Sequence, residues 1–459
     1  MALAPSRILD APAALDAALR GRIIRPGDED YDTARRVHNL AYDAYPALIV
    51  RVAGAGDVAT AIEFATDTGL ELAVRGGSHS LAGHSTGDGV LVIDVSAMKG
   101  LHIDPERALV WAEAGLTAGE VTNALAEHGL AVPFGDTGNV GIAGLTLGGG
   151  IGYLARKHGL AIDHLISAEL VTADGELLTV SANEHPDLFW AIRGGGGNFG
   201  IVTRFVYEAV PVGMVYGGAL GLPATPEVLA GLAAVADAAP DELTIIAGVM
   251  TAPPMPFVPD AWVGKLVVLV TGVFDGDPEA GAAAFAPIRA LAEPVVDLLG
   301  PMPYPAIYKI TEAAAQPSPD IVRSAFVDTF DVEAARLTLD AMSRATSPGA
   351  MFQLRPLRGA VARVAPEATA FAHRDARFLV AIITLYEGDA TPHRAWTEGL
   401  FEALRPLARG VYSNFVTDEG EARVRDAYPN ATYARLAAVK AEYDPDNVFH
   451  RNQNIRPAR

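Results

Sequence analysis

Short hydrophobic runs alternate with helical patterns along the N-terminal part of the chain. Residues 48–53 (LIVRVA) and 71–77 (ELAVRGG) have the length and composition of strands. The segment 58–69 between them predicts a helix, which we expect Asp57 to cap and Gly69 to end. Together these segments predict a β-α-β unit.

The same alternation continues further along the chain. We predict strands at 90–96 and 108–115, a helix at 117–129 and a hairpin at 165–181. The dipeptide Asp174-Gly175 marks the tight turn of the hairpin. From 212 to 407 glycine clusters become rare, and a strand at 265–274 precedes a helical pattern at 278–293. This change in composition and pattern predicts a second domain.

Composition and charge exclude several classes of function. The 459 residues are 50% hydrophobic and carry a formal net charge of −20, which disfavours binding to nucleic acid or to anionic membranes. The absence of cysteine excludes disulfides, iron–sulfur clusters, thiolate zinc sites and cysteine nucleophiles. The charged N-terminus lacks the apolar core of a signal peptide, and no apolar run reaches the length of a membrane span. We therefore expect a cytoplasmic protein.

Glycine is concentrated in three clusters, at 75–87, 137–152 and 193–202. Glycine is costly inside regular structure, so the clusters indicate sharp turns or close approach to a ligand. Backbone N–H groups in such loops bind the pyrophosphate of an extended cofactor. The alternative is a set of tight turns in a loop-rich fold.

Other glycine motifs bear on different chemistries. The sequence has no GxxxxGK[ST] phosphate loop. GAGDVA (54–59) resembles a dinucleotide fingerprint, but Ala59 replaces its third glycine and Asp57 adds a carboxylate, which favours a loop leading into a helix. GHSTG (83–87) matches the nucleophile elbow of serine hydrolases, with Ser85 as nucleophile. That elbow needs a helix directly after the serine, whereas a turn and a strand are expected here.

His79 lies in the first glycine cluster, within RGGSHSLAG. This loop resembles that of FAD-linked oxidases of the vanillyl-alcohol-oxidase superfamily, berberine-bridge-enzyme-like branch. Segments 137–165, 187–203 and 433–455, with YSNF at 412–415, resemble further motifs of the family in order and spacing. The resemblance implies a covalent bond from His79 to the 8α-methyl of the flavin. Many relatives add a cysteinyl bond, but the second cluster has no cysteine, which implies a single, histidyl linkage.

The resemblance also implies which residues contact FAD. Ile142 lies where relatives place a residue thought to gate oxygen access. The residues expected to bind the cofactor are Arg75, Gly76, Gly77, Ser78, His79, Ser80, Gly83, His84, Thr137, Gly138, Gly141, Ile142, Gly144, Leu147, Gly148, Gly149, Gly152, Gly200, Val202, Tyr412 and Asn414.

Three residues are candidates for catalysis. Tyr412 matches a position from which relatives present an active-site tyrosine, and a tyrosine is a poor base unless its pKa is lowered. Gln353 and Arg355 alternate on one predicted strand and so share a face. We expect Arg355 to lower the pKa of Tyr412 or to bind an anionic substrate. The alternatives are an aromatic residue packed between domains and a solvated strand face.

His373 and Arg374 in FAHRD resemble a family position near the flavin. A buried ion pair of Arg374 with an acid such as Asp375 is the alternative explanation.

The sequence thus predicts an α+β protein: a PCMH-type FAD-binding domain of two α/β subdomains and a substrate domain with an antiparallel sheet backed by helices. The first domain spans 1–211, with 408–459 returning to it, and the second spans 212–407. The expected reaction is oxidation of an alcohol or amine C–H of a small molecule by FAD, with O2 reduced to hydrogen peroxide. A flavin dehydrogenase with another acceptor, a serine hydrolase and a non-catalytic FAD-binding protein are the alternatives. No metal is expected.

Overall fold

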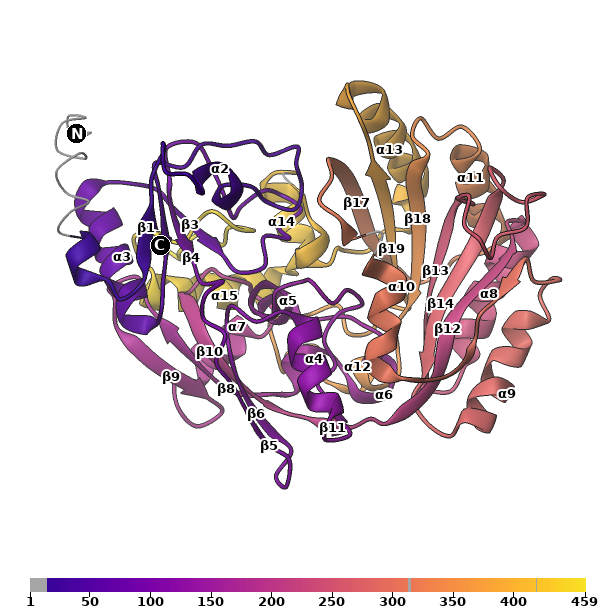
Figure 1. The fold of residues 1–459 in the computed structure, drawn as a ribbon, viewed down its shortest axis with the longest axis horizontal. Helices are drawn as coiled ribbons and strands as arrows, with labels where there is room; N and C mark the ends of the chain where they lie inside the picture. The colour runs from indigo at the N-terminus through magenta and orange to yellow at the C-terminus, as the bar shows by residue number, and fades with distance from the viewer. Residues whose placement is uncertain (1–14, 313–314, 418) are drawn as a thin grey trace.

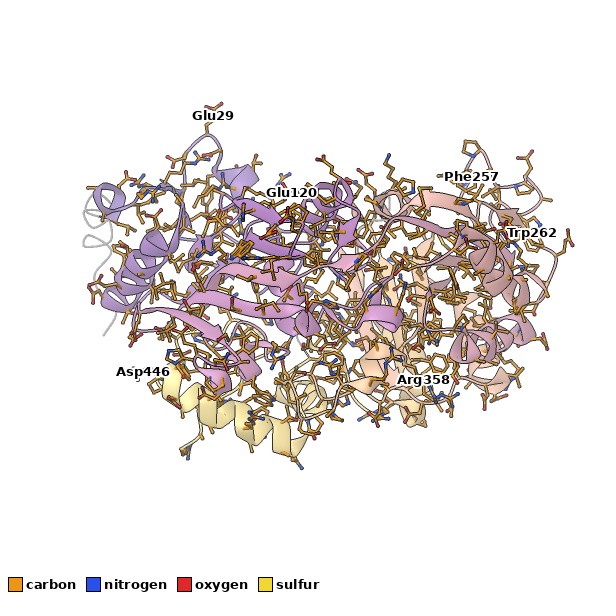
Figure 2. The ribbon with its side chains drawn as sticks, turned by 90° about the horizontal axis from the view of Figure 1, so that it is seen from below. Glu29, Glu120, Phe257, Trp262, Arg358 and Asp446 are labelled. Atoms are coloured by element: carbon orange, nitrogen blue, oxygen red, sulfur yellow. The ribbon has the colours of Figure 1, made fainter. Side chains whose placement is uncertain are left out.

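The computed structural model describes residues 15–312, 315–417 and 419–459. Figure 1 shows two regions side by side, and the yellow C-terminal segment returns to the indigo and magenta one. We call these the glycine-rich region (15–211 with 408–459) and the strand-rich region (212–407). Figure 2 shows Phe257 and Trp262 at one end of the molecule and Asp446 at the other.

The glycine-rich region begins with a four-stranded sheet in the order β1-β2-β4-β3. Its strands are β1 (Arg22–Ile24), β2 (Leu48–Arg51), β3 (Leu72–Arg75) and β4 (Leu91–Asp94). Strand β4 pairs in parallel with both β2 and β3, because helix α3 (Ala55–Thr68) carries the chain from β2 to β3. The predicted β-α-β unit is confirmed.

The two ends of α3 differ in how well the sequence predicts them. Gly69 ends the helix in the left-handed conformation at φ 69°, as expected. The predicted start is wrong, because the N-cap is Gly54 and no side chain caps it. The Asp57 carboxylate instead accepts hydrogen bonds from the backbone N–H groups of Gly21 and Ala53, both at 2.8 Å. A carboxylate in this position leaves no role for GAGDVA in phosphate binding.

A five-stranded antiparallel sheet completes this region, in the order β5-β6-β10-β8-β9. Its strands are β5 (Leu101–Asp104), β6 (Leu109–Glu113), β8 (Leu165–Val171), β9 (Leu177–Ser181) and β10 (Ile201–Glu208). Gly175, at φ 82°, forms the predicted turn between β8 and β9. Thr117 and Glu120 form a capping box at the start of α4 (Ala118–Ala126).

Further helices and short strands complete this region. They are α2 (Tyr31–Ala34), β7 (Leu130–Ala131), α5 (Ile142–Gly148), α6 (Ala155–His158), η1 (Ala161–Asp163), α7 (Pro186–Ile192), β11 (Val210–Pro211), η5 (Ser413–Phe415), α14 (Glu421–Ala427) and α15 (Asn430–Tyr443). Strands β7 and β11 form a two-stranded sheet.

The strand-rich region is an eight-stranded antiparallel sheet in the order β15-β12-β14-β13-β18-β19-β17, with β16 also paired to β12. Its strands are β12 (Met214–Pro223), β13 (Leu243–Thr251), β14 (Leu266–Phe274), β15 (Val296–Asp297), β16 (Gly300–Pro303), β17 (Asp320–Val327), β18 (Gly349–Pro356) and β19 (Phe378–Leu385). This is the antiparallel sheet that the sequence predicts.

Helices back one face of this sheet and leave the other facing the glycine-rich region (Figure 1). The backing helices are α8 (Pro226–Ala238), α9 (Pro278–Arg289), α11 (Val332–Met342) and α13 (Ala390–Leu404), and the remaining elements are η2 (Tyr304–Ile307), α10 (Tyr308–Glu312), α12 (Ala360–Arg363) and η4 (Arg405–Leu407).

Each region has its own large hydrophobic core. One core joins residues of 15–209 to residues of 411–455 and to Ala370, and the other lies between the long sheet and its helices. The α+β fold class is confirmed. We retain the division at 211 and 407 as a proposal, supported by the two cores. Among the described helices, none is both long and apolar enough to cross a membrane.

Candidate cofactor and substrate site

A cavity of about 490 Å³ lies between the two regions. Residues of all three glycine clusters line it, together with 412–416 and 451–453 of the C-terminal segment. The opposite wall is one face of β17, β18 and β19, to which β18 contributes alternate side chains. The cavity therefore joins parts of the chain that are far apart in sequence.

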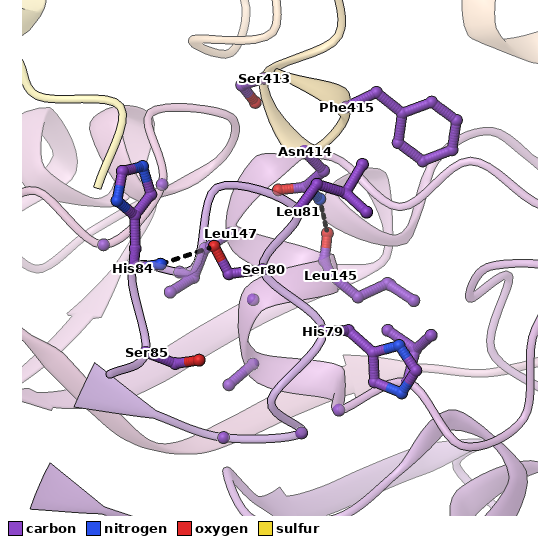
Figure 3. Close-up of a pocket in the computed structure, with 18 of the residues that line it drawn as sticks. His79, Ser80, Leu81, His84, Ser85, Leu145, Leu147, Ser413, Asn414 and Phe415 are labelled. Atoms are coloured by element: carbon purple, nitrogen blue, oxygen red, sulfur yellow. Dashed lines mark hydrogen bonds between the residues drawn. The ribbon is translucent and has the colours of Figure 1, made fainter. Parts of the chain in front are cut away.

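His79 projects from the first glycine loop, directly after β3 (Figure 3). Ser78, just before it, has a left-handed φ of 64°, which sets the direction of the loop. The ring of His38 stacks on that of His79 at 4.0 Å between centroids. Burial, with a smaller contribution from His38, lowers the pKa of His79 to about 4, against a hydrogen bond with the Asn139 backbone. The imidazole is therefore neutral at pH 7.

Arg75 supports this loop from behind and does not line the cavity. Its Nε and Nη2 donate to the carbonyl of Ser85, each at 3.2 Å, and its Nη1 donates to the carbonyl of Ala34. These bonds tie the far end of the loop to α2. Arg75 therefore positions the loop from outside the cavity lining, and its contact with the cofactor stays a prediction.

Two glycine loops meet backbone to backbone beside His79. A Cβ on Gly77 would lie 2.3 Å from the Gly141 nitrogen, and a Cβ on Gly141 would lie 2.5 Å from the Gly77 nitrogen. Gly144 and Gly197 are different, because a Cβ on either would meet no atom within 4 Å. Both line the cavity, so their missing side chains leave space along its wall. A long, flat cofactor such as FAD fits this arrangement.

Most of the predicted cofactor residues come together here. Those that line the cavity are Gly76, Gly77, Ser78, His79, Ser80, His84, Thr137, Gly141, Gly144, Leu147, Gly200, Val202, Tyr412 and Asn414.

The other predicted cofactor residues lie behind the cavity lining, where most of them allow close packing of the chain. They are Arg75, Gly83, Gly138, Ile142, Gly148, Gly149 and Gly152. A Cβ on Gly148 would lie 2.1 Å from Asn414 Oδ1, and one on Gly152 would lie 2.2 Å from the Phe134 carbonyl oxygen. Ile142 is fully buried in the core, so its side chain does not reach the cavity.

Tyr412 and Asn414 connect the C-terminal segment to the second glycine cluster. The Tyr412 hydroxyl accepts hydrogen bonds from the Gly150 N–H and from Asn414 Nδ2, both at 2.9 Å. Asn414 Nδ2 also donates to the Leu145 carbonyl at 3.1 Å (Figure 3). Burial raises the pKa of Tyr412 to about 12, although Gly150, Asn414 and Arg355 act to lower it. Arg355 thus acts on the pKa of Tyr412 in the expected direction, but desolvation outweighs its charge and the net pKa rises.

Gln353 and Arg355 lie on one face of β18, as the alternation predicts. Arg355 donates to Gln353 Oε1 from Nε at 3.1 Å and from Nη2 at 2.6 Å. Nη2 also lies 2.9 Å from an Asp136 carboxylate oxygen, an ion pair that the sequence does not reveal. The guanidinium sits 5.1 Å from the centre of the Phe415 ring. The charge of Arg355 is therefore already balanced.

His373 and Arg374 do not line the cavity. Arg374 makes two hydrogen bonds of 2.7 Å to the Asp163 carboxylate, and Asp375 pairs with Arg409. The alternative of a buried ion pair is correct, but its acid is Asp163.

Comparison with known proteins agrees with this geometry. A model described as "FAD binding domain" matches residues 46–181, and one described as "Berberine and berberine like" matches 411–456. An uncharacterized FAD-linked oxidoreductase of Bacillus subtilis is 34% identical over 453 residues, covering 96% of this chain and 98% of that protein. The chain belongs to the family of FAD-linked oxidoreductases.

Another member of this family, (R)-6-hydroxynicotine oxidase of Paenarthrobacter nicotinovorans, is 31% identical and covers 98% of this chain and 99% of its own. Among solved structures, 6-hydroxy-D-nicotine oxidase of Arthrobacter nicotinovorans aligns with a TM-score of 0.87 at 27% identity, covering 96% of this chain and 98% of that one. The family assignment therefore extends over nearly the whole chain.

An FAD-linked oxidoreductase has no need of the serine-hydrolase elbow, and the local structure rejects it. Ser85 Oγ is buried and, among the described residues, has no hydrogen-bond partner that could act as its base. The chain after Ser85 turns and enters β4 rather than a helix. The serine-hydrolase alternative is therefore rejected.

Reasoning from the sequence does not identify four residues at or beside this site: His38, Asn39, Asp136 and Asp320. His38 stacks on His79, and Asn39 bonds to Asp320. Each is a single polar residue in an ordinary sequence context, and only tertiary folding brings it to the cavity or, for Asn39, beside a residue that lines it. We find no sequence signal that singles them out.

Proposed function

We propose that this chain is an FAD-dependent oxidase that oxidises an alcohol or amine group of a small molecule and holds its FAD covalently through His79. The observation that carries the proposal is the neutral imidazole of His79 in a cavity lined by three glycine clusters and by a sheet face of apolar and polar side chains. FAD, when bound, supplies a hydride acceptor and passes the electrons to O2, which gives hydrogen peroxide.

His79 has the properties that a covalent linkage requires. A neutral imidazole keeps a lone pair on one ring nitrogen, and a pKa of about 4 keeps this form dominant at neutral pH. Stacking on His38 restricts the ring. Since the chain contains no cysteine, we propose one linkage and not two.

The sheet face is the proposed substrate wall. Apolar side chains of Val322, Met351 and Ile383 line it beside Gln353 and Arg355. A surface of this kind binds the carbon skeleton of a small molecule and orients its polar groups. Tyr412, un-ionised at neutral pH, is proposed to orient the substrate or cofactor through its hydroxyl.

The linkage is tested on the purified protein. We expect a yellow protein whose colour stays with the polypeptide after acid precipitation, with the mass increased by one FAD. His79→Ala should lose the acid-stable flavin while keeping its fold. His128→Ala, which changes an exposed histidine outside the cavity lining, should keep it. A colourless wild-type protein after reconstitution with FAD would contradict the proposal.

The oxidase reaction needs a separate assay. A peroxide-coupled screen of sugars, alcohols and cyclic amines should give one class of substrate. If the flavin is reduced by a substrate but only an artificial dye reoxidises it, the enzyme is a dehydrogenase.

A further inference from the structure

Asp320 is a buried carboxylate in the wall of the cavity. It is the first residue of β17, has 9% of its surface exposed and lines the cavity with Val322, two residues further along the strand. Among the described residues, no cation lies within ion-pair distance of it. Burial alone raises the pKa of Asp320 to about 7. A carboxylate in this position is costly unless something compensates its charge.

Asn39 holds this carboxylate in place. Its Nδ2 donates to Asp320 Oδ1 at 2.8 Å, and its Oδ1 accepts the Asp320 backbone N–H at 3.2 Å. An asparagine at 320 would accept the same side-chain hydrogen bond. The contact therefore explains where residue 320 lies but not why it is an acid.

The other charges of the cavity have partners. Asp136 pairs with Arg355 at 2.9 Å, and Arg451 pairs with Glu71 at 3.1 Å. The titratable side chains that line the cavity with Asp320 are His38, His79, His84, Asp136, Arg355, Tyr412, Tyr428 and Arg451. Burial lowers the pKa of both His38 and His79, so neither supplies a positive charge near neutral pH.

The sheet register shows that Arg355 is too far away to compensate Asp320. Asp320 pairs with Leu385 of β19, whereas Arg355 pairs with Leu379 of the same strand. Six residues along a strand correspond to about 20 Å. Asp320 lies instead near His79, because Asn39 bonds to Asp320 and the adjacent His38 stacks on His79.

We propose that Asp320 forms a subsite for a positively charged nitrogen of the substrate, at the His79 end of the cavity. The proposal rests on the proposed function, since it names a substrate class for the same site: molecules with a protonated amine. Such a group supplies the missing counter-charge, and the sheet face accommodates the rest of the molecule.

The test is binding to the holoenzyme, followed by the change in flavin absorbance and by calorimetry. The probe is benzyltrimethylammonium, whose charge is independent of pH, and benzyl alcohol is the uncharged comparison. Because ionisation of Asp320 is centred near pH 7, the cation should bind about tenfold more tightly at pH 8 than at pH 6. Binding of benzyl alcohol should not change with pH.

Two variants identify the group responsible. Asp320→Asn should weaken binding of the cation by about tenfold to a hundredfold and remove its dependence on pH. Asp43→Asn makes the same change of net charge on an exposed residue near Asn39 and should bind like the wild type. Wild-type affinity in Asp320→Asn, or an unchanged pH dependence there, would overturn the proposal.

If Asp320→Asn does not fold, binding to the wild-type protein still tests the subsite. Failure of the cation to bind, or equal binding at pH 6 and pH 8, also rejects the subsite. The flavin spectrum of the same samples reports the proposed function separately. If the protein carries covalent flavin but does not bind the cation, the proposed function stands and only the Asp320 subsite is rejected.

Discussion

The glycine-loop wall of the cavity is built from main chain, whereas the sheet wall is built from side chains. On the first wall, Gly77 and Gly141 touch through their backbones, and a methyl group on either would clash. On the second, Gln353, Arg355 and Asp320 project from regular strands. The strands themselves place few demands on which side chain they carry.

This difference explains why one wall constrains the sequence more than the other. A Cβ at residue 77 would lie 2.3 Å from the Gly141 nitrogen, so this position tolerates only glycine and the glycine-loop wall leaves a pattern in the sequence. A strand face accepts many side chains without a change of fold. The chemistry of the cofactor is therefore visible in the sequence, and that of the substrate is not.

The largest effect is expected from a substitution that disrupts the glycine-loop wall. Gly77→Ala places a Cβ against the Gly141 backbone, which cannot move as a flexible side chain can. We expect loss of FAD from the purified protein, measured as flavin absorbance per polypeptide. Gly56→Ala is the control, since its Cβ meets no atom within 4 Å and the helix favours alanine. Normal flavin content in Gly77→Ala would show that the wall does not depend on glycine.

The same contrast separates what the sequence predicts from what it does not. The glycine clusters and His79 are adjacent in sequence and share one function, so a resemblance finds them. His38 is 41 residues before His79 in the chain, and nothing local predicts that the two rings stack. Arg374 pairs with Asp163, a partner 211 residues away, rather than with the neighbouring Asp375.

Energetic balance is a further limit on prediction from sequence. Arg355 near Tyr412 acts to lower the tyrosine pKa, in the direction that the sequence predicts. Burial has the larger effect, so the pKa of Tyr412 rises to about 12. Desolvation depends on everything that surrounds the hydroxyl, and no short segment of sequence contains that information.

The next largest effect is expected from a buried ion pair behind the glycine-loop wall, where it tests whether the pair stabilises the fold. Lys440 and Asp444 are fully buried, and the Lys440 ammonium donates to Asp444 at 2.5 Å and to the Asn198 carbonyl at 2.6 Å. Lys440→Met leaves the carboxylate unpaired, so we expect a loss of about 3–5 kcal/mol in the free energy of unfolding. Urea denaturation measures it. Lys99→Met, in an exposed pair with Glu120, should cost less than about 1 kcal/mol.

A smaller effect, of opposite sign, is expected on the sheet wall. Because the pKa of Asp320 is raised to about 7, the folded protein binds more protons than the unfolded chain between about pH 4 and pH 7. Its stability therefore falls as pH rises through this range. Asp320→Asn removes the penalty and should stabilise the protein by about 2–4 kcal/mol at pH 8 but not at pH 4.

Urea denaturation at the two pH values measures this effect, with Asp43→Asn as the control for net charge. A variant that is less stable than the wild type at pH 8 would show that the carboxylate is a structural group. A stabilised variant would show that the sheet wall keeps an acid despite its cost, unlike the paired charges behind the glycine wall.

The smallest effect is expected where the two walls meet, at Tyr412. Tyr412→Phe removes the acceptor for the Gly150 N–H, and an unpaired buried donor costs about 1–3 kcal/mol. If the hydroxyl only orients the site, kcat/KM should fall by about tenfold. A general base would contribute about a hundredfold or more.

Since the pKa of Tyr412 is about 12, the pH profile of the wild type between pH 6 and pH 10 should persist in the variant. Loss of an ionisation from that profile, with a rate reduced by more than a hundredfold, would make Tyr412 the proton acceptor and assign the catalytic base to the glycine-rich region.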